Sequence, residues 1–406
     1  MTAPPRHGST LPDLEEGQFI CTHMRILKQL GRGSFGAVYL VEDERSMGQA
    51  AAKVESFHTP TPQLETEARI MDELQRYDGF PTFYAFLKSE RHEMRVLVME
   101  KLGASVESIW RASPEGRLPL VEVLEIGRQA LRRLETLHTH YYVHRDIKPE
   151  NLIWGSSDVG KQNMLFLIDY GLSKQLKGQD GRHIPDKPEQ RFVGSPRFAS
   201  IHAHDGRVQS RRDDLEALTY SLVALAKGTL PWQNIELTEK EVAHAYLQAT
   251  RSYNAHVEAA AASADTCTST STSTSTSASA GAGAGAGAKS GHSTSAVAAD
   301  AQCNGGRSTG LFAAELMKQR DALQQKFDVY DAKVADALGV QRVEYYIHKH
   351  QHNMRTRKMV GIKTSITPHV LCSDLPPCFR ELLEHARRLE FAEMPDYGVI
   401  HCQWKA

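Results

Sequence analysis

The sequence lacks the features that would direct it to a membrane or to nucleic acid. Its 48 lysines and arginines nearly balance its 49 aspartates and glutamates, so net charge favours neither nucleic acid nor a membrane surface as a partner. No window approaches the ~20 apolar residues that a membrane-spanning helix needs, and the first residues, MTAPPRHGSTLPDLEEG, lack a signal peptide's apolar stretch. We therefore expect a soluble protein of the cytoplasm, the nucleus or both.

Cysteine is scarce as well. The six cysteines have neither the close paired spacing of a zinc site nor the density of a disulfide framework, which is typical of reduced intracellular thiols. The segment HKHQH offers His348, His350 and His352 as metal ligands. Because no cysteine or carboxylate constellation accompanies these histidines, we do not adopt a metal site there.

The first part of the chain is expected to be a small β-rich lobe with one main helix. Between residues 24 and 102, four short apolar segments bounded by turn residues predict strands: MRILKQL, AVYLVED, AAAKVE and RVLVME. The segment PQLETEARIMDEL places Leu64, Ala68, Met71 and Leu74 on one helical stripe, with proline at its start. Residues 1–23 are expected to be a disordered N-terminal segment.

The second part is expected to be a larger α-helical lobe, made of residues 103–234 and 354–406. A chain of 406 residues exceeds a single small core, which agrees with two lobes and an α+β fold class. Apolar residues recur there at three- and four-residue steps, as helices require. They are Val123, Ile126, Ala130, Leu131, Leu134 and Leu137, and then Leu215, Leu218, Leu222 and Ala226.

Residues 235–353 are predicted to be an insert in this helical lobe. Its alanine, serine, threonine and glycine tract, about 258–310, has too little apolar surface to offset the entropy of ordering and is expected to be disordered. In the range of about 311–350, apolar residues recur at the three- and four-residue steps of a helix. A helix that packs on its own domain is favoured over a partner-binding coiled coil, because sustained heptads are too few. The insert remains a candidate contact for a protein partner.

The segment GRGSFGAVYL is suited to phosphate binding, because Gly31, Gly33 and Gly36 let backbone amides approach phosphate oxygens closely. In a dinucleotide-binding fold it would open a helix, but here it leads into AVYLV, so it should connect two antiparallel strands. Lys53 ends a later strand and Glu67 lies on the next helix, where an ion pair would orient the lysine toward ATP phosphates. Two surface charges are the alternative for that pair alone.

The segments YYVHRDIKPENLIW and LFLIDYGLS bring a base, a cation and metal ligands together. Asp146 would accept or orient the proton of an attacking hydroxyl, and Lys148 would neutralise charge on the transferred phosphoryl group. Asn151 and Asp169 would hold magnesium. In-line phosphoryl transfer needs such groups close together, so the spacing predicts an enzyme that uses ATP and Mg²⁺.

At these motifs the chain resembles the eukaryotic protein kinases, and Lys148 within HRDIKPEN resembles the serine/threonine branch. The segments GSPRFASIHAHDGRVQSRRDDLEAL and KGTLPWQ are similar to the casein kinase I family. That family has a Ser-Ile-Asn type segment where most kinases have Ala-Pro-Glu, and here it reads Ser200, Ile201, His202. The C-terminal KTSITPHVLCSDLPPCFRELLEHARRLEFAEMPDYGVI is similar to the end of its catalytic domain. The resemblance runs from residue 24 to about 400, interrupted by the insert.

The resemblance implies a bilobal kinase fold and an ATP site between the lobes. Met99 would be the gatekeeper, Glu100 to Leu102 the adenine-contacting hinge, and Ala51 an adenine-packing residue. Asp214 would tether the catalytic loop from a helix. The residues expected to contact ATP are Gly31, Gly33, Ser34, Phe35, Gly36, Val38, Ala51, Lys53, Met99, Glu100 and Leu102.

The resemblance also implies a substrate preference. Arg197 would contribute to an anion pocket that recognises an acidic or phosphorylated residue upstream of the target, since a guanidinium binds anions bidentately. Arg355 and Arg357 in MRTRK are candidate partners, with a solvated basic cluster as the alternative.

The expected activation loop is poor in phosphorylation sites. The only side-chain hydroxyls between Asp169 and Arg197 belong to Tyr170, Ser173 and Ser195. Ser195 matches the position of a threonine that braces the active site in the resembled family. We therefore expect a kinase that is active without phosphorylation of this loop.

Two alternatives stay open. Tyr170 gives Asp-Tyr-Gly, as in vaccinia-related kinases, so a vaccinia-related or tau-tubulin kinase-like member of the same group competes with the casein kinase I assignment. A pseudokinase scaffold that binds partners through its insert is the alternative from another class of function. The presence of Lys53, Asp146, Asn151 and Asp169 counts against the scaffold.

Overall fold

The computed structural model describes residues 14–255 and 340–405, except residues 22, 34–35, 189–191, 246, 250 and 253–254. The chain divides into two compact units. Unit 1 comprises Met1–Asn234 and Lys358–Ala406, and unit 2 comprises Ile235–Arg357. The sheet and the helices that surround the candidate site all belong to unit 1.

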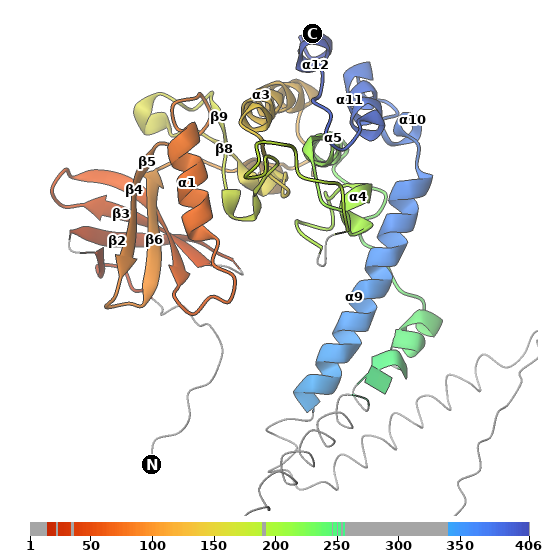
Figure 1. Cartoon of the computed structure of the whole chain (residues 1–406), viewed down its shortest axis with the longest axis horizontal. Helices are drawn as coiled ribbons and strands as arrows, with labels where there is room; N and C mark the ends of the chain where they lie inside the picture. The colour runs from red at the N-terminus through yellow and green to blue at the C-terminus, as the bar shows by residue number, and fades with distance from the viewer. Residues whose placement is uncertain are drawn as a thin grey trace, which may run out of the picture. The chain divides into compact units, whose positions relative to one another are not determined.

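One antiparallel sheet of six strands, in the order β1-β2-β3-β4-β6-β5, makes up the smaller lobe (Figure 1). Alternate residues of its central strands, among them Val41, Ala52 and Val96, form a buried core. The four segments predicted as strands are confirmed, whereas β5 was not predicted. The strands are β1 (Phe19–Cys21), β2 (Met24–Gly33), β3 (Gly36–Asp43), β4 (Gly48–Ser56), β5 (Phe83–Ser89) and β6 (Met94–Glu100).

The expectation of a disordered segment over residues 1–23 is wrong for the part of it that the structure describes. Phe19–Cys21 pairs with β2, and the N–H of Gly17 donates to the carbonyl of Ile26 at 2.8 Å. Leu14 and Ile20 are buried in the sheet core. The apolar stretch Phe19–Cys21 is only three residues long and follows acidic residues, so the sequence has little strand pattern there. Its burial depends on pairing with β2.

The main helix of this lobe, α1 (Leu64–Leu74), forms where it was predicted. Its buried face contains Leu64, Ala68, Met71 and Leu74, as the spacing predicts, and it packs against β5 and β6. Glu67 is buried on the same helix, with only 1% of its surface exposed. A buried carboxylate on this face requires a positively charged partner.

Helices make up the larger lobe, and its core lies where α3, α5 and α11 pack together (Figure 1). On α3, a Cβ at Gly127 would overlap the ring of Trp404, so glycine permits the close approach of the chain that follows α12. The helices of this lobe are α2 (Val106–Ala112), α3 (Leu120–Thr139), α4 (Ile201–His204), α5 (Arg211–Lys227), α10 (Pro368–Leu371), α11 (Pro377–Arg388), α12 (Tyr397–Gln403) and the last turns of α9 (Val340–Ser365).

Two short antiparallel ladders place the two polar loops of the candidate site. Strand β7 (Tyr142–Val143) pairs with β10 (Lys174–Gln175), and β8 (Leu152–Trp154) pairs with β9 (Leu165–Leu167). Residues 144–151 therefore connect β7 to β8, while residues 168–173 connect β9 to β10. The two loops come from strands that pair with each other at both ends. The predicted α+β fold with a β-rich lobe and a helical lobe is confirmed.

The predicted insert of residues 235–353 falls entirely within unit 2. Residues 256–339, which include the alanine, serine, threonine and glycine tract and most of the predicted helix at 311–350, lie outside the described residues. Helix α9 continues through residue 353 to Ser365, so the boundary predicted there falls inside a helix. Across the described ranges, no helix is both long and apolar enough to cross a membrane.

Candidate active site

Lys53 connects the sheet, α1 and the loop after β9. Its ammonium donates to Glu67 Oε2 at 2.6 Å and to Asp169 Oδ1 at 2.7 Å. Burial alone would lower the pKa of Lys53, but the two carboxylates outweigh burial and raise it, so the side chain stays charged. Burial raises the pKa of Glu67 against the attraction of Lys53. The predicted ion pair is present, and it also includes Asp169.

The glycine loop joins β2 to β3 as an antiparallel hairpin, in which Gly33 pairs with Gly36. A Cβ at Gly36 would overlap the carbonyl oxygen of Val54, so glycine is required there by packing. A Cβ at Gly31 or Gly33 would meet nothing within 4 Å. Those two glycines thus border open space among the described residues. Ser34 and Phe35 of the same loop lie outside the described residues.

Three of the residues predicted to contact adenine lie on adjacent inner strands of the sheet. Ala51 on β4 pairs with Met99 on β6, and both are buried. Val38 on β3 pairs with Lys53, while the half-buried Leu102 follows β6. These positions agree with a pocket for a flat base beside the lysine.

The hinge residue Glu100 has contacts that the sequence did not indicate. Its Oε2 accepts from the backbone N–H and the hydroxyl of Thr82 at 3.1 and 3.0 Å, and its Oε1 accepts from Lys161 Nζ at 2.5 Å. The carboxylate of Glu100 is thus held by Thr82 and Lys161.

The loop between β7 and β8 holds Asp146 in a defined orientation. Lys148 Nζ donates to Asp146 Oδ2 at 2.7 Å and to Ser195 Oγ at 3.1 Å, and Asn151 Nδ2 donates to the Asp146 carbonyl at 2.8 Å. The other carboxylate oxygen, Asp146 Oδ1, is buried and accepts no hydrogen bond within the part of the chain that the structure describes. This oxygen therefore keeps its capacity to accept a hydrogen bond.

Asp214, at the start of α5, fixes the backbone of the same loop. Its Oδ1 accepts from the N–H of Arg145 at 2.8 Å, and its Oδ2 accepts from the N–H of His144 at 2.7 Å. The φ of Arg145 is 69°, a left-handed conformation that costs a non-glycine residue free energy. The carboxylate also contacts His138 Nε2 at 3.0 Å, and His138 Nδ1 in turn lies 2.6 Å from the Tyr397 hydroxyl.

The loop after β9 turns sharply at Asp169, whose φ is 67°. Burial would raise the pKa of Asp169, but Lys53 outweighs burial and lowers it, so the carboxylate is charged. Tyr170 is fully buried, packs its ring against Phe80 and His144, and donates its hydroxyl to the Leu167 carbonyl. Tyr170 is therefore a packing aromatic whose hydroxyl has a partner.

The site contains the groups that an ATP-dependent phosphotransferase needs. They are a glycine-rich hairpin, a lysine paired with a helix glutamate, and an aspartate and an asparagine on one loop. A family model described as "Protein kinase domain" matches residues 24–279, which is more than half of the chain. The chain belongs to the protein kinase family. A domain of this family uses ATP and acts on protein substrates.

The kinase offers two side chains for a metal ion, at the positions predicted. Asn151 donates through its Nδ2, which leaves its amide oxygen as a ligand, and Asp169 has a second carboxylate oxygen besides the one that Lys53 holds. Mg²⁺ is usually bound by one or two side chains together with substrate phosphates, so this donor set fits it. Among the described residues, no group of three or more His, Cys, Asp or Glu could hold a metal ion, and the HKHQH histidines form none.

In the kinase, Arg197 lies two residues after Ser195 with its guanidinium 4.8 Å from the ring centroids of both Trp110 and Phe198. Burial lowers the pKa of Arg197, while Glu107 and Glu150 oppose that shift, so carboxylates already face this cation. Arg355 and Arg357 belong to unit 2 and are exposed. The structure therefore places Arg197 beside the catalytic loop. The pairing of Arg197 with Arg355 and Arg357 stays a prediction.

Proposed function

We propose that this kinase transfers the γ-phosphate of ATP to serine and threonine residues of proteins, with Mg²⁺ as its cofactor. The observation that carries the proposal is the arrangement of Asp146. Lys148 holds one of its oxygens, and the other is buried without a partner among the described residues. The charged pair of Lys53 and Glu67 accompanies it, as phosphoryl transfer requires.

The residues divide the chemistry between them. Lys53, oriented by Glu67, contributes positive charge for the ATP phosphates beneath Gly31 and Gly33. The Asp146 carboxylate accepts the proton of the attacking hydroxyl, while Lys148 offsets negative charge that develops on the transferred group. Asn151 and Asp169 would hold Mg²⁺, which when bound neutralises charge on the phosphates.

We further propose a casein kinase I-like preference for acidic or phosphate-primed sites. Support comes from the segments GSPRFASIHAHDGRVQSRRDDLEAL and KGTLPWQ, and from the position of Arg197 close to Ser195. The carboxylates of Glu107 and Glu150 near Arg197 weaken the attraction of this cation for an anion. The preference is therefore expected to be moderate.

The deciding experiment is transfer from magnesium-ATP to four peptides that differ only in one feature. One contains a serine in a neutral context, one has an upstream acidic run, one has an upstream phosphoserine, and one has tyrosine in place of serine. Transfer to the serine peptides and not to the tyrosine peptide supports the serine/threonine assignment. Absence of transfer to these peptides and to protein substrates would favour a scaffold instead.

Replacing Arg197 with glutamine is expected to reduce the preference for the acidic or primed peptide roughly tenfold, because a hydrogen bond to a charged group contributes about 1.5–3 kcal/mol. The measurement is the ratio of kcat/KM for the primed and the neutral peptide. Arg117→Gln, an exposed arginine paired with Glu115, is the control. An unchanged ratio in the Arg197 variant would remove this residue from the anion pocket and keep the kinase.

The kinase is expected to keep its activity without phosphate on the loop between Asp169 and Arg197. In support, Arg145 Nε donates to the Leu172 carbonyl at 2.6 Å, and Lys148 reaches Ser195 directly. Phosphatase-treated enzyme should retain kcat/KM within about twofold, since these contacts already hold the described ends of the loop. Mass spectrometry of the treated and untreated enzyme checks for loop phosphate, and a large loss on its removal would contradict the expectation.

A further inference from the structure

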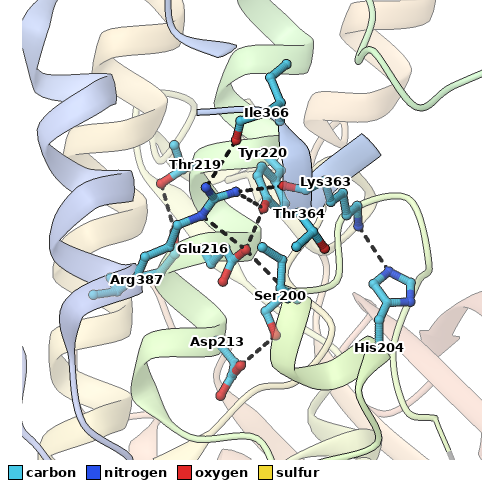
Figure 2. Close-up of polar contacts among 12 residues, drawn as sticks. Ser200, His204, Asp213, Glu216, Thr219, Tyr220, Lys363, Thr364, Ile366 and Arg387 are labelled. Atoms are coloured by element: carbon cyan, nitrogen blue, oxygen red, sulfur yellow. Dashed lines mark hydrogen bonds and ion pairs between the residues drawn. The ribbon is translucent and has the colours of Figure 1, made fainter. Parts of the chain in front are cut away.

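A buried lysine, Lys363 near the end of α9, lies behind the segment that carries Ser195 and Arg197. None of its surface is exposed. Its ammonium donates to the carbonyls of Pro196 at 2.8 Å and Ala199 at 2.7 Å, and it lies 3.1 Å from His204 Nε2. Figure 2 shows the side chain reaching toward His204 from α9.

The environment of Lys363 is unusual for a cation, because no described carboxylate forms an ion pair with it. The rings of Tyr220 and Trp232 lie 5.2 and 5.1 Å from Nζ, close enough for cation–π attraction. Burial lowers the pKa of Lys363 to about 7, and Glu216 opposes the shift from a greater distance. Burying an unpaired lysine costs free energy. The carbonyls of Pro196 and Ala199 offset part of that cost as long as they stay within hydrogen-bond distance of the ammonium.

The charged groups around Lys363 are occupied with one another. Arg387 lies 3.8 Å from Glu216 Oε1 and donates to the Tyr220 hydroxyl at 3.0 Å and to the Lys363 carbonyl at 3.2 Å (Figure 2). Glu216 Oε1 also accepts from the N–H of Ile201 at 3.3 Å. The ammonium is therefore left to the backbone carbonyls rather than to Glu216.

The segment that Lys363 contacts is held at successive positions by side chains of the larger lobe. Between the carbonyls of Pro196 and Ala199, that of Arg197 accepts from Trp232 Nε1 at 2.8 Å. At the start of the segment, Ser195 Oγ accepts from Lys148, which also holds Asp146. Any shift of these carbonyls would move residues 195–199 relative to the Asp146 carboxylate.

We propose that Lys363 is a positioning residue for substrate binding, which holds residues 195–199 against the catalytic loop through the carbonyls of Pro196 and Ala199. The inference rests on the proposed kinase function. It gives the chain that follows unit 2 a part in the active site, since Lys363 lies 164 and 167 residues from its two acceptors. Lys363 touches neither ATP nor the attacking hydroxyl in this arrangement.

The test is steady-state kinetics of Lys363→Met with a serine peptide and with ATP. Methionine fills a similar volume but donates no hydrogen bond. The KM for the peptide should rise about tenfold, the effect of losing hydrogen bonds to a charged group, while the KM for ATP stays within about twofold. Lys363→Arg, which keeps the donors, should recover part of the loss. Lys227→Met, at the last residue of α5, replaces a half-buried lysine that donates to Ser373 and serves as the control, which should behave as wild type.

A second variant keeps the inference testable if Lys363→Met does not fold. Trp232→Phe keeps a ring beside Lys363 but removes the donor to the Arg197 carbonyl, and a smaller rise in the KM for the peptide is expected. Folding is checked by thermal melting and by the stabilisation that ATP confers. A peptide KM within twofold of wild type in a folded Lys363→Met variant, or in Trp232→Phe if the first does not fold, would overturn the inference. Absence of transfer by the wild type would instead refute the proposed function.

Discussion

Asp146→Asn is expected to lower kcat for phosphate transfer by about 10²–10⁴, the usual contribution of a general base. Asparagine has the same shape, and its amide oxygen can still accept from Lys148 in place of Asp146 Oδ2. Its amide nitrogen cannot accept the proton of a hydroxyl, however, so the chemistry is lost while the loop is preserved. Transfer to the serine peptide under saturating magnesium-ATP measures the effect.

Two further measurements make the result specific to the chemistry. The thermal midpoint and the KM for ATP should stay close to those of wild type, because Asp146 contacts neither the glycine loop nor Lys53 in the described structure. Asp72→Asn, an exposed aspartate on α1, is the control and should retain full activity. If Asp146→Asn transferred phosphate at the wild-type rate, another residue would have to be the base.

Much of the site was predictable because its residues lie in short segments whose geometry is local. The glycine loop leads into β-branched and aromatic residues, and a hairpin is the structure that such a pattern favours. Asp146, Lys148 and Asn151 are separated by a few residues on one loop, so any compact loop brings them together. The contact of Lys53 with Asp169 spans 116 residues, and nothing in the sequence indicated it.

The features that the sequence did not indicate lack a local pattern of their own. Strand β5 pairs with the next strand, β6, but its burial does not alternate along the strand, so it does not have the usual strand pattern. Other features depend on distant parts of the chain. Lys363 looks like any exposed helix lysine in sequence. Its burial becomes intelligible only when the carbonyls of Pro196 and Ala199 and the ring of Trp232 are in place around it.

Substituting Asp214 is expected to cause the largest loss of stability among single changes at this site. Asp214 is 1% exposed and accepts from two backbone N–H groups and from His138. In Asp214→Asn the amide nitrogen would point at a donor, which leaves a buried N–H without an acceptor. The free energy of unfolding should fall by about 3–5 kcal/mol, as when a buried charged network loses one member, and transfer activity should fall with it.

The pH dependence of this loss follows from the pKa of Asp214. Burial would raise that pKa, but the hydrogen bonds from His138 and from the His144 N–H lower it below its ordinary value of 3.8. The unfolded chain therefore takes up the proton first as the pH falls, so the carboxylate's stabilisation is complete above about pH 4 and declines at lower pH. Urea unfolding of wild type and Asp214→Asn should give a constant difference from pH 8 to about pH 5, and a smaller one only in stronger acid. A difference that shrank already near neutral pH would mean that His138, rather than the carboxylate, carries the titrating contribution.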